Sequence, residues 1–131
     1  MDWTPGIISA GAIVGALGRH YANQLWLTRQ RSPFPLSTLV VNLTGATLMG
    51  FGVTLLQGLL LDRPDLRQLL LVGGLGAYTT FSTYIADTDY LTRAYSWRLG
   101  LLYGVGTPLA GVISFWLGRS LALCLGPLVQ P

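Results

Sequence analysis

Residues 73–84 read Gly-Gly-Leu-Gly-Ala-Tyr-Thr-Thr-Phe-Ser-Thr-Tyr, and this segment is the most informative about the fold. Three glycines and four Ser or Thr residues make a poor continuous helix, although the surrounding residues 68–86 carry no charge. Membrane proteins tolerate a broken helix where the freed backbone is buried in protein or lines an ion site. An ordinary helix whose hydroxyls bond back to its own carbonyls is the alternative. The density of glycine and hydroxyl residues favours a helix broken at mid-membrane.

The composition of the whole chain indicates an integral membrane protein. Of the 131 residues, 51% are apolar and only 10% are charged, whereas soluble domains carry roughly a quarter charged residues. The eight basic residues are all arginine and are scattered, which excludes a basic face for nucleic acid. One Cys and one His exclude an internal disulfide and a Cys/His metal cluster. No nucleophile–base set is visible, so we do not expect an enzyme.

Four apolar stretches are long enough to cross a bilayer, which needs about 20 helical residues. They lie at about residues 3–26, 36–61, 68–91 and 99–123, with short linkers that carry the charges and prolines. We therefore expect an all-α membrane protein with one four-span domain over residues 1–131. Trp26, Trp97 and Trp116 lie near span ends, as interfacial aromatics do. An even number of spans puts both termini on the same side.

Small residues predict close helix packing in two of these spans. Gly11 and Gly15 are one helical turn apart, as are Gly100 and Gly104. Such pairs let two helix backbones approach each other closely in a membrane.

The arginines give almost no preference for one orientation in the membrane. The side shared with the termini would hold three (Arg63, Arg67 and Arg119), and the other side four (Arg29, Arg31, Arg93 and Arg98). A weakly biased protein that inserts one way is one interpretation. Insertion in both orientations, followed by antiparallel dimerisation, is the other, and the small size of the chain favours a dimer.

Two polar residues within the first two spans need partners. Arg19 either reaches the membrane interface or has an inward functional or electrostatic role, since an intramembrane Arg is costly. Asn42 lies six residues into the second span. Its amide either makes a structural bond between helices or presents N–H groups to an anion path.

Aromatic and hydroxyl residues add to the polar features of the third and fourth spans. Phe81 and Tyr84 are three apart and share a helix face, and their ring edges carry positive partial charge that suits a small anion. Tyr103 and Thr107 are four apart and place hydroxyls on one face. Backbone carbonyls freed by a helix break are hard oxygen ligands, suited to an alkali cation.

At these residues the chain resembles the small fluoride channels of the Fluc (CrcB) family. The resemblance includes Gly15-Ala16-Leu17-Gly18-Arg19, Asn42-Leu43-Thr44-Gly45 and the run Thr79-Thr80-Phe81-Ser82-Thr83-Tyr84, and it covers essentially the whole chain. It implies an antiparallel, dual-topology homodimer with two fluoride pores. It also implies a central sodium ion held by the backbone carbonyls of Gly76 and Thr79. The implied pore residues are Asn42, Phe81, Ser82, Thr83, Tyr84, Tyr103 and Thr107.

The chain departs from the family pattern in four places: Ala77-Tyr78 within the third span, Tyr84 in place of a second Phe, Asp87 in place of Glu, and Gly111 in place of a hydroxyl residue. The resemblance still implies passive fluoride export across a bacterial inner membrane. A four-span multidrug exporter is the alternative, but it would need a membrane-embedded acid for proton coupling. A structural subunit without transport would leave the polar motif of the third span unexplained.

Overall fold

The computed structural model describes residues 3–27, 34–59 and 63–129, and within these residues it contains helices and short connections only. The elements are α1 (Thr4–Leu27), α2 (Leu36–Leu59), α3 (Pro64–Arg67), η1 (Gln68–Leu75), α4 (Gly76–Tyr78), α5 (Phe81–Ala94) and α6 (Trp97–Val129). The expected all-α class is confirmed. Residues 60–61 of the second expected span, and the linker residues Arg29 and Arg31, lie outside the described residues.

The third long segment is built from four successive elements. Pro64 begins α3, where the missing N–H of a proline costs nothing, and the chain stays helical through the π-helical turns of η1 and through α4. Thr79 and Thr80 then adopt extended backbone angles (φ −75°, ψ 159° and φ −144°, ψ 119°). Helix α5 starts at the next residue, Phe81. The interruption therefore falls within the stretch Gly73–Tyr84.

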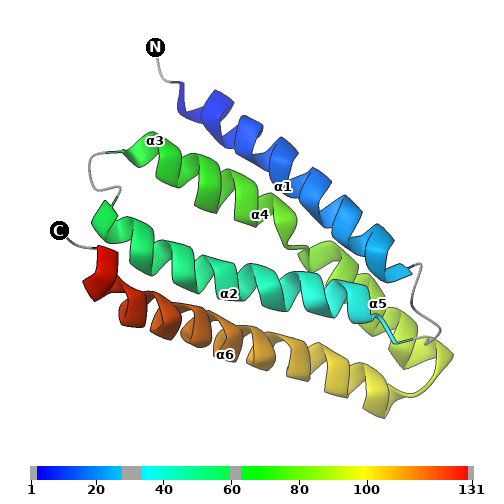
Figure 1. The fold of residues 1–131 in the computed structure, drawn as a ribbon. Helices are drawn as coiled ribbons and strands as arrows, with labels where there is room; N and C mark the ends of the chain where they lie inside the picture. The colour runs from blue at the N-terminus through cyan, green and yellow to red at the C-terminus, as the bar shows by residue number, and fades with distance from the viewer. Residues whose placement is uncertain (1–2, 28–33, 60–62, 130–131) are drawn as a thin grey trace.

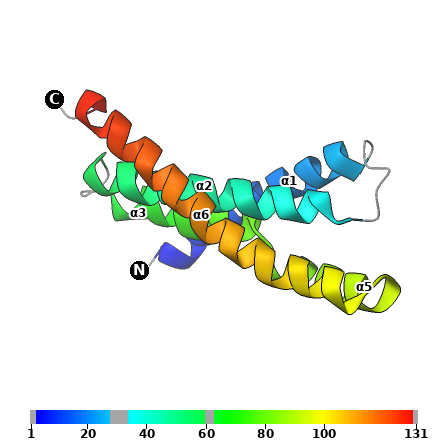
Figure 2. The same cartoon turned by 90° about the horizontal axis from the view of Figure 1, so that it is seen from below.

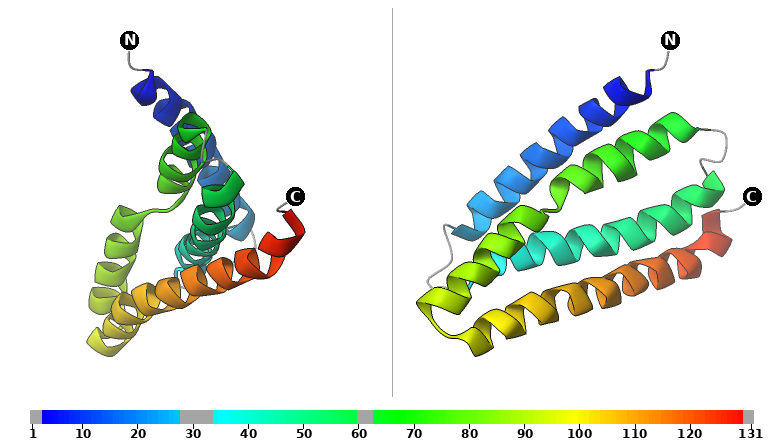
Figure 3. Two further views of the ribbon diagram at one scale, coloured as in Figure 1. Left: turned by 90° about the vertical axis from the view of Figure 1, so that its left-hand side faces the viewer. Right: turned by 180° about the vertical axis from the view of Figure 1, so that it is seen from behind.

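Consecutive long segments run in opposite directions, so α1 is parallel to the third segment and α2 is parallel to α6, and both termini lie at the same end of the molecule (Figure 1). Elements η1 and α4 pack against α1, whereas α5 packs against α6. The two halves of the third segment thus have different neighbours. Figure 2 shows α5 lying along α6, away from α1, and Figure 3 shows the change of direction between the halves from two further sides.

Close backbone contacts at glycines hold the helices together. A Cβ at Gly11 would overlap the carbonyl of Leu69, and one at Gly15 would overlap the carbonyl of Gly74. A Cβ at Gly100 would overlap the side chain of Thr92. Both predicted glycine pairs therefore contain helix contacts, which confirms that interpretation. The α2–α6 contact is equally close, because Gly50 and Gly118 each lie against a carbonyl of the other helix.

Three helical stretches of the described residues are long and apolar enough to cross a membrane: Leu36–Leu56, Pro64–Ala94 and Trp97–Leu125. Helix α1 has a suitable length of 24 residues, but Arg19, His20, Asn23 and Gln24 reduce its hydropathy. On α6, Trp97 and Trp116 are 19 positions apart, or about 28 Å, which matches the hydrocarbon thickness. The C-terminal turns of α6 therefore extend beyond the expected span 99–123.

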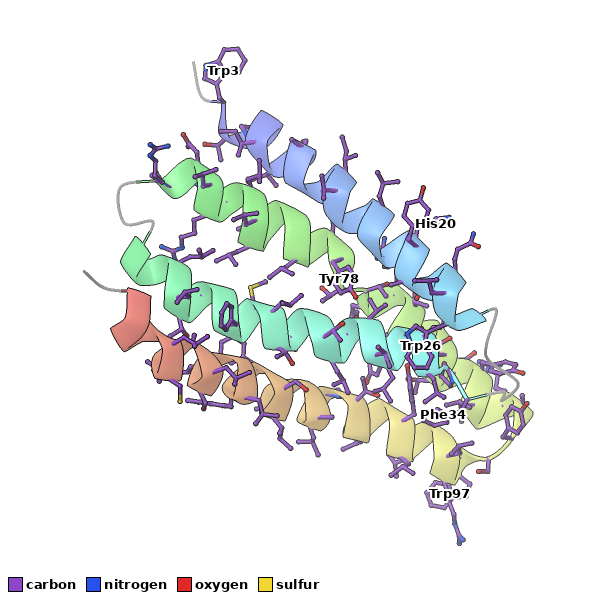
Figure 4. All side chains as sticks on the ribbon, viewed as in Figure 1. Trp3, His20, Trp26, Phe34, Tyr78 and Trp97 are labelled. Carbon is purple, nitrogen blue, oxygen red and sulfur yellow. The ribbon has the colours of Figure 1, made fainter. Side chains whose placement is uncertain are left out.

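Few side chains are buried within the single chain, since most apolar side chains of a membrane protein face lipid or another chain. The fully or almost fully buried apolar residues are Val41, Leu71, Leu91, Tyr103 and Ala122. Figure 4 shows Trp3 and Trp97 projecting away from the helices, and Tyr78 between α1 and α2 near the interruption.

Candidate functional site

Asn42 on α2 binds both polar groups of the Thr80 backbone. Its Nδ2 donates to the Thr80 carbonyl at 3.0 Å, and its Oδ1 accepts the Thr80 N–H at 2.8 Å. In a continuous helix the Thr80 N–H would instead donate to the carbonyl of Gly76. The Asn42 amide therefore replaces helical hydrogen bonding at the interruption and satisfies groups that would be costly to leave unpaired in a membrane. One of the two N–H groups on Nδ2 is committed to Thr80.

The preceding residue, Thr79, is held from the other side by α1. The Nη1 of Arg19 donates to the Thr79 carbonyl at 3.2 Å, so the guanidinium points inward rather than toward a membrane interface. The Thr79 hydroxyl donates to the carbonyls of Leu75 at 3.2 Å and Gly76 at 3.4 Å. Arg19 and Asn42 thus hold two successive extended residues from two different helices.

Thr80 also caps the helix that follows it. Its Oγ1 accepts the N–H of Thr83 at 3.3 Å, a typical N-cap contact. The same hydroxyl donates to the Thr83 Oγ1 at 2.9 Å and lies 3.4 Å from the Ser82 Oγ. Thr80 itself is buried, whereas Ser82 and Thr83 are exposed. The hydroxyls of Ser82 and Thr83 are therefore gathered around the start of α5.

A row of aromatic rings leads away from the interruption. The ring centroids of Phe81 and Tyr84 are 5.6 Å apart, those of Tyr84 and Tyr103 are 5.9 Å apart, and those of Tyr103 and Phe34 are 5.5 Å apart. Phe81 is 75% exposed, while Tyr103 is only 2% exposed. The Tyr84 hydroxyl donates to the carbonyl of Gly104, so it is committed to α6. The ring edge of Tyr84, rather than its hydroxyl, is the group left for a ligand.

An open pocket of about 440 Å³ lies beside these groups, between α2, α5 and α6. Its walls include Asn42, Thr79, Phe81, Tyr84 and Thr107 from the predicted site. Ser82, Thr83 and Tyr103 do not line this pocket, and neither does Arg19 or Gly76. Gly111 does line it, so the departure from the family's hydroxyl at this position removes a polar group from the wall.

Two further residues, Thr80 and Thr38, matter for the site, and neither was among the predicted site residues. Thr80 is the residue that Asn42 binds. A threonine three residues before Thr83, at the expected start of a helix, could have predicted this N-cap from the sequence. Thr38 is buried and lies one helical turn before Asn42, on the same face of α2. Asp87 and Tyr103 lie near Thr38. The buried Tyr103 hydroxyl and the Asp87 Oδ2 have no hydrogen-bond partner within the described part of the chain.

The oxygens at the interruption have the chemistry of an alkali-cation site. The carbonyls of Gly76 and Thr79 lie where the helix ends, and each accepts one side-chain donor, from Thr79 and Arg19 respectively, which leaves a lone pair that a cation can use. No cluster of three or more His, Cys, Asp or Glu residues that would suit a transition metal occurs in the described part of the chain. The donor set of Gly76 and Thr79 therefore fits a monovalent hard cation.

The fold and the site together define a class of protein. Helices that span the membrane, an interrupted segment with bound backbone groups, and an open pocket lined by amide, hydroxyl and aromatic groups are features of proteins that pass small solutes across membranes. The chain belongs to the CrcB family, because the family model described as "CrcB-like protein, Camphor Resistance (CrcB)" matches residues 6–119. The resemblance stated from the motifs is confirmed.

Curated relatives cover nearly the whole chain. A "Fluoride-specific ion channel FluC" of Trichormus variabilis is 42% identical over 123 residues, covering 93% of this chain and 90% of the relative. A protein of the same name from Synechocystis sp. is 42% identical over 119 residues, covering 91% and 92%. One from Synechococcus sp. is 40% identical over 119 residues, covering 90% and 91%.

Proposed function

We propose that this protein is a fluoride-selective channel that conducts fluoride passively, and that it is not an enzyme. One observation carries the proposal: the Asn42 amide holds the extended Thr80 backbone beside an open pocket lined by Phe81, Tyr84 and Thr107. Relatives of 40–42% identity that are named fluoride-specific ion channels support the identity of the ion. A multidrug exporter is set aside, because membership of the CrcB family favours the channel.

The proposed mechanism replaces the water around fluoride with groups already in place. Fluoride is small and a strong hydrogen-bond acceptor, so its path must supply donors at each point. The second N–H of Asn42 and the hydroxyl of Thr107 are donors at the pocket wall. The edges of the Phe81 and Tyr84 rings add positive partial charge. Chloride is larger and accepts hydrogen bonds more weakly, so a narrow path of this kind disfavours it.

The functional unit of the proposal is a homodimer of two antiparallel copies with dual topology. The openness of the pocket, the exposed Phe81 ring and the small buried core of the single chain support a second copy at this face. The near balance of arginines supports insertion in both orientations. In this arrangement the third segment is broken at mid-membrane, and the exposed Phe81 of one copy contributes to the path of the other.

A structural sodium ion at the dimer centre is part of the same proposal. The Gly76 and Thr79 carbonyls of two copies would supply four hard oxygens, and no carboxylate is needed to hold a monovalent ion. When bound, the ion would supply positive charge at the centre of the membrane and tie the two interruptions together. The residues of this chain do the positioning: Arg19 fixes the Thr79 carbonyl, and Asn42 fixes the next peptide.

The protein spans the membrane several times, and we propose the bacterial inner membrane as its location. Its role there would be to let cytoplasmic fluoride leave the cell after HF has entered by diffusion, which gives resistance to fluoride.

Fluoride efflux from liposomes that hold only this purified chain tests the proposal. We expect rapid fluoride release when a potassium carrier removes the opposing voltage, and no matching release of chloride. Cross-linking and size measurement on the same sample report whether the active unit is a dimer. Absence of fluoride release from a folded, reconstituted dimer would overturn the proposed function.

A further inference from the structure

The helix that leads into the interruption, η1, is wound more widely than an α-helix. Within residues 3–27, 34–59 and 63–129, Gln68–Leu75 is the only π-helical stretch. Its hydrogen bonds join residues five apart instead of four, and the N–H of Gly76 still reaches back to the carbonyl of Leu71. π-Helical turns are rare and occur frequently at functional sites. The groups assigned to the ion path do not explain why this one lies directly before the interruption.

Helix α1 lies alongside η1, in the first half of the third segment (Figure 1). Three contacts between them each bring an α1 residue against a backbone carbonyl: Gly11 at Leu69, Gly15 at Gly74, and Arg19 at Thr79. The α1 residues are four apart, whereas the carbonyls are five apart. A Cβ at Gly11 would also lie 3.0 Å from the nitrogen of Gly74. The carbonyl and the nitrogen that a five-residue turn joins therefore meet at this glycine, so the packing on α1 follows the π winding.

An α-helix could not present these carbonyls to α1 in the same order. Five α-helical residues turn through about 500°, which is about 140° beyond one full turn, and rise about 7.5 Å. Four residues of α1 rise only about 6 Å. If residues 69–74 were α-helical, the Gly74 carbonyl would be turned about 140° away from Gly15 and displaced along the axis by about 1.5 Å. A π turn returns to the same face after five residues, which removes this mismatch.

The interruption depends on this register, because the two side chains that bind it come from other helices. Arg19 lies one turn beyond Gly15 on α1, and Asn42 lies on α2. Their hydrogen bonds to the backbone of Thr79 and Thr80 are 2.8–3.2 Å long. A turn of about 140° moves a backbone atom at a radius of about 2.3 Å by about 4 Å. Hydrogen bonds do not survive such a displacement.

We propose that η1 is a positioning element of the ion path. Its π turn takes up one residue more than an α turn, and this residue keeps the interruption level with Arg19 and Asn42. Removing one residue from the π turn should leave an α turn with the same ends, because the two contacting carbonyls would then be four residues apart, as the glycines of α1 are. Removing one residue beyond the π turn has no such compensation. The inference rests on the proposed fluoride conduction only for its flux measurement.

Two single-residue deletions in the same segment test this role. Deletion of Leu70, whose side chain is 45% exposed on η1, shortens the π turn. Deletion of Ala77, which lies in α4 between η1 and the interruption, is the matched control because it shortens the segment equally. We expect fluoride efflux from liposomes to stay within about threefold of the wild type after the first deletion, and to fall about tenfold or more after the second, since the hydrogen bonds of the Thr80 peptide are lost.

A cysteine cross-link reports the register without depending on conduction. A Cβ at Gly18 would lie 3.7 Å from the Cδ2 of Tyr78. In a Cys124→Ser background, a short bifunctional thiol reagent should therefore join Gly18→Cys to Tyr78→Cys. The cross-link should persist after deletion of Leu70. It should be lost after deletion of Ala77, which moves the residue at position 78 about 100° around the helix.

The two readouts leave the inference open to refutation in each direction. Loss of the cross-link after deletion of Leu70 would overturn it, whatever the efflux. A retained cross-link without efflux in that protein would also contradict it, because register would then not be what η1 supplies. Retention of both readouts after deletion of Ala77 would show that the register is not needed. Absence of fluoride efflux from the wild type would instead overturn the proposed function, and the cross-links would still decide the register.

Discussion

Replacing Asn42 with aspartate tests the centre of the site, since the side chain keeps its size while its donor is replaced by a charged oxygen. The carboxylate retains an oxygen for the Thr80 N–H, which Oδ1 accepts at 2.8 Å. Its other oxygen takes the place of Nδ2, which donates to the Thr80 carbonyl at 3.0 Å. An attractive contact between donor and carbonyl becomes a repulsive contact between two oxygens. The variant also lacks the second N–H that the proposed path uses.

A loss of folding free energy and an electrostatic repulsion of fluoride together determine how far Asn42→Asp should lower the fluoride flux. Leaving the Thr80 carbonyl without its buried donor costs about 1–3 kcal/mol of folding free energy. A carboxylate about 5 Å from a fluoride ion, at an effective dielectric constant of about 20, raises the energy of that ion by about 3 kcal/mol. The repulsion alone lowers flux by about two orders of magnitude. The loss of conduction should therefore exceed what partial unfolding explains.

Fluoride efflux from liposomes measures the flux, and size-exclusion chromatography with thermal denaturation measures the amount of folded dimer. Thr54→Val is the matched control: Thr54 lies on the same helix and its hydroxyl only donates to the Gly50 carbonyl of its own helix, at 2.9 Å. We expect the control to conduct normally. Normal flux through a folded Asn42→Asp dimer would refute the reasoning and would leave Asn42 with a purely structural role.

Three further predictions concern packing, charge and orientation. Gly15→Ala places a Cβ against the Gly74 carbonyl and should destabilise the fold by about 1–3 kcal/mol in denaturation measurements, whereas Gly106→Ala, with open space around it, should not. Arg19→Gln removes a charge-assisted bond to the Thr79 carbonyl, so the thermal midpoint and the fluoride flux should both fall, and unchanged values of both would argue against this role. Two lysines added at one end of the chain should bias insertion and deplete one orientation in a tag-accessibility assay; unchanged orientation and activity would argue for a fixed topology.

Removal of sodium tests the proposed central ion. We expect protein purified and reconstituted without sodium to conduct fluoride less well, and to recover when sodium is returned. Gly76→Leu should lower conduction more than Thr79→Val, because the carbonyl geometry at the break matters more than the side chain of Thr79. Full conduction by an intact dimer after verified loss of every bound cation would contradict a supporting role for the ion.

Several features of the site were predictable from the order of residues alone. The stretch Gly73–Tyr84 contains the point where helical structure stops, since glycines and hydroxyl residues there disfavour a continuous helix. Asn42, Phe81, Tyr84 and Thr107 were singled out as polar or aromatic groups in apolar spans, and all four line one pocket. That the interruption lies at mid-membrane stays a prediction.

Other features were not predictable, because they depend on which atoms meet between distant segments. Nothing local to Asn42 indicates that its amide is shared with the peptide of Thr80, 38 residues later. The aromatic character of Tyr84 does not reveal that its hydroxyl is committed to the Gly104 carbonyl. That Thr38, Asp87 and Tyr103 lie near one another, with the Tyr103 hydroxyl buried, likewise requires three helices to be placed together.

The membrane environment, the helical class and the family could be predicted from the amino-acid sequence, because hydropathy and glycine placement act on each segment separately and the span motifs identify the CrcB family. How the polar groups are used depends on the packing of the helices. A hydrogen-bond donor between membrane helices has few acceptors within reach. The close α1–η1 and α2–α6 contacts at glycines determine which acceptors lie near each donor. Packing thus commits one N–H of Asn42 and the Tyr84 hydroxyl to the backbone, and leaves the exposed Phe81 ring available for the proposed ion path.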